Sequence, residues 1–228
     1  RNASSEGGAF FISGQETNTT MQNRWDQATA ELFAAGSELG LRVYTSNLLG
    51  QDPDLVLHGG GNTSVKATRQ TVFGEPQAVL FVKGSGWDLR TIEAAGFPAV
   101  RMDYLLKLGQ LQSLSDSEMM RQLRVALLDP SAPTPSVEAI LHALIPHKYV
   151  DHSHADAVVT ISNSPDGELL LNEIYGNDVL ILPYIMPGFI LARQVAEATQ
   201  SLDWSTIRGI VLLHHGLFTF DDDAKISY

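Results

Sequence analysis

Short β-like runs alternate with helical patterns along this chain, and this alternation is the feature that most constrains its fold. The expected strands, bounded by glycine, proline or polar residues, cover 62–68, 78–83, 148–154, 178–182, 210–213 and 217–220. Apolar residues recur at helical spacing over 23–39, 116–128, 136–145, 155–162, 167–175 and 187–198. Such alternation is typical of a layered α/β domain. Hairpin-like pairs near 62–83 and 210–220 favour a mixed sheet.

Glycines, prolines and acidic residues mark where several of these elements begin or end. The helix expected over 23–39 ends at Gly36 and Gly40, and the three prolines of 129–135 predict a loop between two helices. Near the end of the chain, Asp222 or Asp223 can cap a helix that has barely begun. We therefore expect the chain to be cut from a longer one.

Composition narrows the class of protein further. Hydrophobic residues make up 44% and charged residues 18% of the 228 residues, which indicates a compact globular chain rather than a disordered one or a coiled coil. Fifteen Lys and Arg against 26 Asp and Glu leave a formal net charge of −11. Neither a nucleic acid nor an anionic membrane is therefore an expected partner. The chain has no cysteine, so any bound metal must be held by His, Asp or Glu.

The distribution of apolar residues indicates where the protein is located in the cell and how the chain divides into a leader and a domain. The most apolar stretch, 179–192, is broken by prolines and is shorter than the ~20 residues that span a bilayer. Residues 1–8 lack the apolar segment of a secretory signal, so we expect a cytoplasmic protein. We also expect a flexible leader over 1–20 and one domain over 21–228.

Four histidines form two candidate metal-binding groups. His152 and His154 lie two residues apart in an expected strand, so both side chains leave the same face and can meet one ion. A pair of surface or hydrogen-bonded histidines is the equally weighted alternative. His214 and His215 follow the apolar run 209–213, at the carboxyl end of a buried strand. Because strand neighbours point to opposite faces, we expect only one of these two to join the site and the other to lie in the core or just outside the ligand shell.

Glu138 is the candidate catalytic carboxylate. The plain interpretation is an acid that favours the positive end of a helix. A capping box would place the acid at Val137 or Ala139, so capping does not account for Glu138. Its prolines and apolar neighbours can raise its pKa and suit it to act as a base. His142, one turn on, can pair with Glu138 on a metal, although a polar residue on the helix face is the more common interpretation.

Two glycine-rich turns, 59–64 and 83–86, can present backbone N–H groups and hydroxyls to an anion. Neither matches a Walker loop or a dinucleotide fingerprint, and most glycine turns bind nothing. A Schiff-base role for Lys83 is a weaker alternative.

Taken in order, six stretches of the chain resemble the class II aldolase and adducin family. They are LHGGGNTSVK (57–66), FVKGSG (81–86), PSVEAILH (135–142), DHSHADA (151–157), LPYIMPGFILA (182–192) and LLHHGLFTF (212–220). The resemblance implies a three-layer α/β/α fold with a central mixed, largely antiparallel sheet. It also implies one Zn²⁺ ion on His152, His154 and His215, with Glu138 as the base. The phosphate contacts that it implies are Asn62, Thr63, Ser85, Gly86 and Ser136.

Within that family, the chain looks most like the aldolase half of bifunctional rhamnulose-1-phosphate aldolase and short-chain dehydrogenase proteins. This implies zinc-dependent retro-aldol cleavage of a ketose 1-phosphate to dihydroxyacetone phosphate and lactaldehyde, and a dehydrogenase half beyond residue 228. Cleavage beside a carbonyl leaves negative charge on an enediolate, which a Lewis-acid metal stabilises while Glu138 moves the proton. One departure is Val137, which replaces the second serine of the PSSE sequence common in phosphate-using members. Asp221 stands where glycine is frequent, and His214 where asparagine is common.

Several alternatives remain open at this point. A pentulose-phosphate epimerase and a sugar-acid decarboxylase need the same metal-stabilised enediolate. A non-catalytic, adducin-like interaction module is a third, although such modules tend to lose the histidines. The resemblance also implies a homo-oligomer, a tetramer in relatives, whose neighbouring subunits complete each site.

Overall fold

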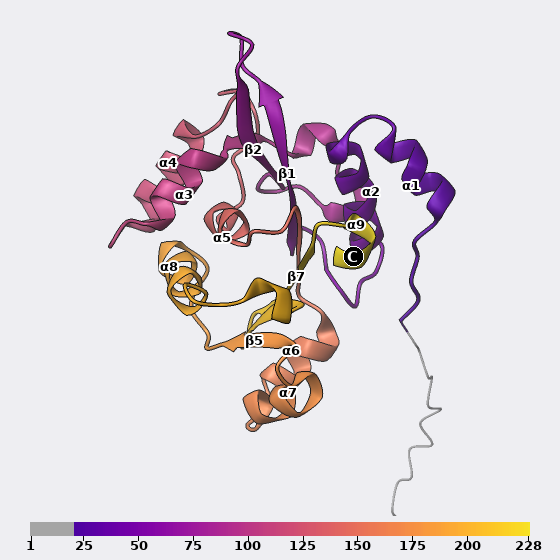
Figure 1. Cartoon of the computed structure of the whole chain (residues 1–228). Helices are drawn as coiled ribbons and strands as arrows, with labels where there is room; N and C mark the ends of the chain where they lie inside the picture. Colours follow the sequence, from indigo (N-terminus) through magenta and orange to yellow (C-terminus); the bar gives the residue numbers. More distant parts are fainter. Residues whose placement is uncertain (1–20) are drawn as a thin grey trace, which may run out of the picture.

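The computed structural model describes residues 21–228, and a seven-stranded sheet forms the middle of the domain (Figure 1). The strands lie in the order β3-β2-β1-β4-β7-β6-β5. Their bounds are β1 Asn62–Gln70, β2 Pro76–Val82, β3 Ala99–Arg101, β4 Tyr149–Ser153, β5 Val179–Leu182, β6 Gly209–Leu212 and β7 Gly216–Asp221. Every neighbouring pair is antiparallel except β5 and β6, which are parallel. The expected mixed, largely antiparallel sheet is confirmed.

Helices cover both faces of this sheet, so the three-layer α/β/α architecture is confirmed. The α-helices of the described residues are α1 Gln27–Ala34, α2 Glu38–Gly50, α3 Met102–Gly109, α4 Asp116–Val125, α5 Ala139–Leu144, α6 Asp156–Ser162, α7 Gly167–Tyr175, α8 Phe189–Ala198 and α9 Ala224–Ser227. Short 3₁₀ turns lie at Leu89–Thr91, Ala94–Gly96 and Trp204–Thr206. One face packs against α3, α4, α5 and α8, and the other against α2, α6, α7 and α9 (Figure 1).

Alternation of side chains along β2 shows how one strand serves both layers. Leu80 and Val82 pack into the core beneath α3, α4 and α5. Val79 and Phe81 point the other way and pack against α2. All four are buried, because a strand covered on both faces has no solvent side.

Some expected elements differ from the observed ones. The helix expected over 23–39 is two helices, α1 and α2, of which the second runs on to Gly50. The sequence patterns did not predict β3 or α3, and they extended α4 by three residues too many. The loop over 129–135 and the cap at Asp223, whose carboxylate accepts from Lys225 N, are confirmed.

The helix expected from residue 136 begins at Ala139 instead. Ser136 is drawn out of the helix because its backbone N–H donates to Lys83 O at 3.0 Å. Its hydroxyl accepts from Glu138 N at 3.3 Å, which closes a local turn before α5. Glu138 is thereby held at the junction between loop and helix.

Among the helices of residues 21–228, none is long and apolar enough to cross a membrane. The flexible leader expected over 1–20 lies outside the described residues.

Candidate active site

The register of three central strands aligns the residues at the centre of the candidate site. His152 of β4 lies opposite Asn62 of β1 on one side and opposite Phe218 of β7 on the other. Residues opposite each other in an antiparallel sheet share a face, so all three side chains point into the same layer. The Phe218 ring stacks on His152 with centroids 4.2 Å apart, which fixes the plane of the imidazole.

Hydrogen bonding sets the tautomer of His152. Its Nδ1 lies 3.1 Å from Leu217 O, and because a carbonyl can only accept, Nδ1 carries the proton. The lone pair of Nε2 is then free, and it faces His154, whose own Nε2 is 3.1 Å away. Metal-binding histidines are commonly oriented in this way by a backbone carbonyl.

Gly216 allows the two rings to come this close to the next strand. A Cβ at this position would lie 2.4 Å from Ser153 O and 3.0 and 3.1 Å from ring carbons of His152 and His154. Any side chain here would push β7 away from the histidines.

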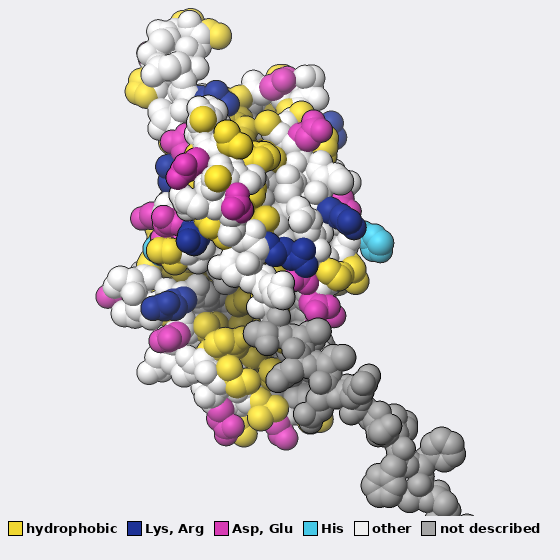
Figure 2. Space-filling model, turned by 90° about the vertical axis from the view of Figure 1, so that its right-hand side faces the viewer, with side chains coloured by type: hydrophobic (Ala, Val, Ile, Leu, Met, Phe, Trp, Pro, Cys, Tyr) yellow, Lys and Arg dark blue, Asp and Glu magenta, His cyan; other side chains and the backbone are white. Residues whose placement is uncertain are grey.

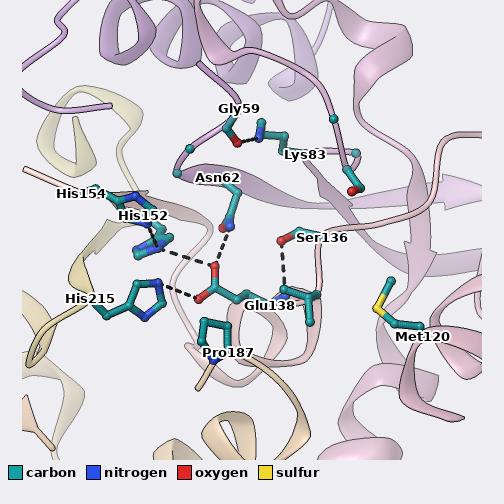
Figure 3. Close-up of a pocket in the computed structure, with 16 residues that line it drawn as sticks. Gly59, Asn62, Lys83, Met120, Ser136, Glu138, His152, His154, Pro187 and His215 are labelled. Carbon is teal, nitrogen blue, oxygen red and sulfur yellow. Dashed lines mark hydrogen bonds and ion pairs between the residues drawn. The ribbon is translucent and has the colours of Figure 1, made fainter. Parts of the chain in front are cut away.

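The third histidine comes from a distant part of the chain. His215 lies in the turn between β6 and β7, where its N–H donates to Leu212 O at 3.1 Å. One nitrogen from each of His152, His154 and His215 falls within 4.8 Å of the others. Figure 3 shows the three rings gathered on one side of the cavity, with Glu138 beside them.

The Glu138 carboxylate faces these rings from the residue just before α5. Its Oε2 accepts from Asn62 Nδ2 at 2.6 Å and lies 3.6 Å from His152 Nε2. Its Oε1 lies 3.7 Å from His215 Nε2 and has no hydrogen-bond partner, although it is buried. One carboxylate oxygen is therefore held and the other is available.

Burial governs the charges of these groups. Desolvation raises the pKa of Glu138, against the opposing attraction of His215 and the hydrogen bond from Asn62. Desolvation lowers the pKa of His152 to about 3 and that of His215 to about 4, and it also lowers the pKa of His154. The three rings are neutral at neutral pH, as metal ligands must be.

The two glycine-rich turns complete the cavity, because backbone hydrogen bonds tie the second of them to the segment before Glu138. Ser85 N donates to Thr134 O at 2.8 Å, and Ser136 N bonds back to Lys83. The resulting cavity has a volume of about 290 Å³. The sugar-phosphate contacts expected from the resemblance that line it are Asn62, Ser85, Gly86 and Ser136.

Lys83 supplies a buried cation at the wall of this cavity. Its ammonium donates to Gly59 O at 2.7 Å, which links the two glycine turns (Figure 3). Desolvation lowers the pKa of Lys83, while Asp88 and Glu138 oppose that shift.

Three other residues singled out from the sequence lie elsewhere. Thr63 is fully buried with its hydroxyl 2.7 Å from Ser46 Oγ, because it points to the opposite face of β1 from Asn62. His214 is exposed at a left-handed backbone position, with Nδ1 3.0 Å from Asn163 Oδ1. The expectation that it lies in the core or just outside the ligand shell is wrong, because the turn rotates it away. His142 is fully buried, and both of its ring nitrogens are hydrogen-bonded, to Ser64 and Asn62.

Two residues of the cavity wall were missed by sequence reasoning. Met120 lines the cavity from α4, and the apolar pattern of that helix does not indicate that Met120 would do so. Pro187 lies in the stretch 182–192 that carries the resemblance, and this was the available signal for it.

The α/β fold brings three histidines and a buried carboxylate together at one cavity, an arrangement that can hold a divalent ion. Residues 42–228 match the family model described as the class II aldolase and adducin N-terminal domain. The chain therefore belongs to the class II aldolase and adducin family, whose aldolases are typically metal-dependent.

The chain is also similar to solved structures and to one curated protein. The N-terminal class II aldolase domain of a conserved protein from Thermoplasma acidophilum is 44% identical, with a TM-score of 0.82 over 92% of this chain and 93% of that one. A sugar-phosphate aldolase from Thermotoga maritima shares the fold, with a TM-score of 0.57 and 15% identity over 81% of this chain and 85% of that one. The uncharacterized oxidoreductase YuxG of Bacillus subtilis is 36% identical over 204 residues, 90% of this chain and 29% of that protein. The chain thus spans under a third of that relative.

Proposed function

We propose that this chain is a zinc-dependent aldolase that cleaves a ketose 1-phosphate of the rhamnulose 1-phosphate type to dihydroxyacetone phosphate and lactaldehyde. The observation that carries the proposal is the convergence of three neutral imidazoles on a buried carboxylate with one unpartnered oxygen. A non-catalytic module has no need for such an arrangement, since burying a carboxylate without full hydrogen bonding costs stability.

The donor set supports zinc as the metal. His152, His154 and His215 offer three nitrogens and no thiolate, as in catalytic zinc sites that leave a position open for substrate. His215 Nδ1 is buried and without a partner, so this ring is held by no competing hydrogen bond at that nitrogen. When bound, a divalent ion supplies Lewis-acid stabilisation of the negative charge that develops on the substrate oxygens.

Glu138 moves the proton at carbon. In the condensation direction its carboxylate takes a proton from C3 of dihydroxyacetone phosphate, which leaves an enediolate that adds to the aldehyde. In cleavage, the bond between C3 and C4 breaks, the C4 hydroxyl proton passes to solvent, and protonated Glu138 returns a proton to C3. The free Oε1 and the raised pKa of this carboxyl suit both directions.

The glycine turns hold the non-reacting phosphate away from the histidines. Ser85, Gly86 and Ser136 line the cavity together with Lys83. An anion bound there gains from the buried ammonium and fixes the reacting carbon beside Glu138. Thr63 can take part only through its backbone, since its side chain faces Ser46.

The direct test is incubation of the zinc-loaded protein with rhamnulose 1-phosphate, followed by an assay for dihydroxyacetone phosphate. Formation of that product with lactaldehyde supports the proposal, and its absence at every metal loading contradicts it. Inversion at a carbinol carbon without cleavage would indicate an epimerase instead, and release of CO₂ from a sugar acid would indicate a decarboxylase.

We further propose that this protein has a dehydrogenase part, forms a homo-oligomer and is cytoplasmic. A dehydrogenase part of the same protein is supported by the name of the Bacillus relative, an oxidoreductase much longer than the matched segment. Two strongly exposed apolar residues, Val72 and Phe73, lie at the tip of the hairpin of β1 and β2 and support a homo-oligomer. A cytoplasmic location completes the proposal.

A further inference from the structure

A series of four buried polar side chains ends on the Glu138 carboxylate. Ser64 Oγ lies 2.8 Å from His142 Nδ1, and His142 Nε2 is hydrogen-bonded to Asn62 Oδ1. Asn62 Nδ2 then donates to Glu138 Oε2 at 2.6 Å. His142 and Ser64 are fully buried, and Asn62 and Glu138 are 7% and 5% exposed, so few solvent contacts compete with the series.

The direction of every hydrogen bond in this series follows from its carboxylate end. An ionised carboxylate only accepts, so Asn62 must turn its NH₂ group toward Glu138 and its carbonyl toward His142. That carbonyl needs a donor, so His142 carries its proton on Nε2 and leaves Nδ1 to accept from the Ser64 hydroxyl. With the amide reversed, Asn62 Oδ1 would face the Glu138 oxygen and repel it.

His142 is the part of the series that can enforce this orientation. Its neutral ring has one donor and one acceptor, and both are used. The Phe218 ring packs edge-on against it with centroids 5.5 Å apart. The backbone of His142 is tied down as well, because its carbonyl accepts from Lys66 Nζ at 3.0 Å.

We propose that His142 is a positioning residue, whose Nε2–H holds the Asn62 amide with its NH₂ group toward Glu138 and so keeps the base aimed at the substrate. The inference rests on the proposed function, in which Glu138 removes a proton from carbon. It explains why a helix of the core keeps a buried histidine at a position where an apolar residue would pack without needing partners.

Two substitutions of His142 separate hydrogen bonding from packing. His142→Gln keeps an N–H at the distance of Nε2, whereas His142→Leu fills similar volume without a donor. With zinc-loaded protein in D₂O, we measure exchange of the C3 proton of dihydroxyacetone phosphate, which reports on proton removal from carbon without the aldol addition. We expect His142→Gln to keep at least a third of the wild-type kcat and His142→Leu to lose ten- to a hundredfold, with KM and zinc content within twofold of wild type.

A matched control is His214→Asn, which removes an exposed histidine outside the cavity, tolerates the left-handed backbone there and should leave exchange unchanged. Equal losses in the Gln and Leu variants, or full activity in the Leu variant, would overturn the positioning role and leave the proposed function standing. A wild-type protein without exchange at any zinc loading would overturn the proposed function and the positioning role together.

The tautomer of His142 can be measured in the wild-type protein, so this test does not depend on whether a variant folds. Long-range ¹H–¹⁵N correlation spectra of wild-type protein labelled at histidine nitrogen should show His142 protonated at Nε2 and bare at Nδ1. A ring protonated at Nδ1 would contradict the inference, because it could not donate to Asn62.

Discussion

Burial lowers the pKa values of the three histidines of the candidate site and raises that of Glu138. We expect His154→Ala to lose most of the bound zinc, because it removes one of three nitrogen ligands. Glu138→Gln should keep the metal and lose about 10²- to 10⁴-fold in turnover, because the amide cannot take a proton. Elemental analysis with steady-state kinetics measures both effects. Full zinc in the histidine variant would remove His154 from the ligand set.

The same burial gives the metal-free protein a pH-dependent stability. The pKa values of folded His152 and His215 are about 3 and about 4, below the ordinary value of 6.5 that they regain on unfolding. The unfolded chain therefore binds more protons between pH 4 and 6.5, and stability falls as the pH drops through that window. We expect a loss of about 1.4 kcal/mol per pH unit for each ring.

Urea unfolding in the presence of a chelator, from pH 7.5 to pH 4.5, measures this dependence. His152→Asn should reduce the slope by one ring's share. A stability that is flat across the window would contradict the buried, neutral state of these histidines.

Individual residues of the candidate site could be predicted from the sequence only where a short local pattern determines the direction of the side chain. His152 and His154 could be predicted to share a face, because alternation along a strand is rigid. The same alternation places the side chains of Thr63 and Asn62 on opposite faces of β1. The family resemblance assigned both residues to phosphate without taking this into account. The hydrogen bonds of His142 could not be predicted, because no local pattern shows that Ser64 and Asn62 lie next to it.

At the scale of elements, two glycines near the first two helices have different roles: Gly36 follows the end of α1, whereas Gly40 lies inside α2. Gly40 was taken as a helix end, yet α2 runs through it, and a Cβ there would lie 2.2 Å from Phe33 O of α1. The glycine thus permits close packing of two helices. We expect Gly40→Ala to cost about 1 to 3 kcal/mol in free energy of unfolding. Gly36→Ala, whose Cβ would meet only Phe33 O at 3.7 Å, is the control and should change stability by less than about 0.5 kcal/mol.

Chemical denaturation of the two variants side by side tests this interpretation. Equal stabilities would show that the helices part without cost and that Gly40 is no packing requirement. The prediction of a helix end at Gly40 failed for a physical reason. The sequence shows that this residue has no side chain, but it does not show that the backbone of α1 occupies the space where a side chain would lie. The short β3 and the adjoining α3 escaped prediction for a similar reason, since β3 has three residues and depends on pairing with β2.

On the scale of the whole molecule, the sheet order brings together segments that are far apart in sequence. Asn62, Glu138, His152 and His215 meet because β1, β4 and β7 are neighbours and α5 packs beside them. The alternation of strands and helices correctly predicted a layered α/β domain with a mixed sheet, and the family resemblance supplied the number of layers. It could not predict this strand order, which depends on contacts between distant strands.

The hairpin of β1 and β2 projects from the rest of the domain (Figure 1), and the projection is also visible in Figure 2. At its tip, Val72 and Phe73 are 95% and 85% exposed. We expect light scattering to give a mass that is a multiple of 24.8 kDa, and Val72→Ser with Phe73→Ser to weaken the assembly. Gln70→Ser, at the base of the same turn, is the control. A monomeric wild-type protein would contradict the proposed homo-oligomer.

The central claim is that His152, His154 and His215 bind one catalytic ion beside a carboxylate that is free to act. Crystals of the zinc-loaded protein, measured on both sides of the zinc absorption edge, test it most directly. We expect one anomalous peak per chain at about 2.0 to 2.1 Å from a nitrogen of each ring, with Glu138 close by. A peak elsewhere, or an ion that lacks any of the three rings, would contradict the account.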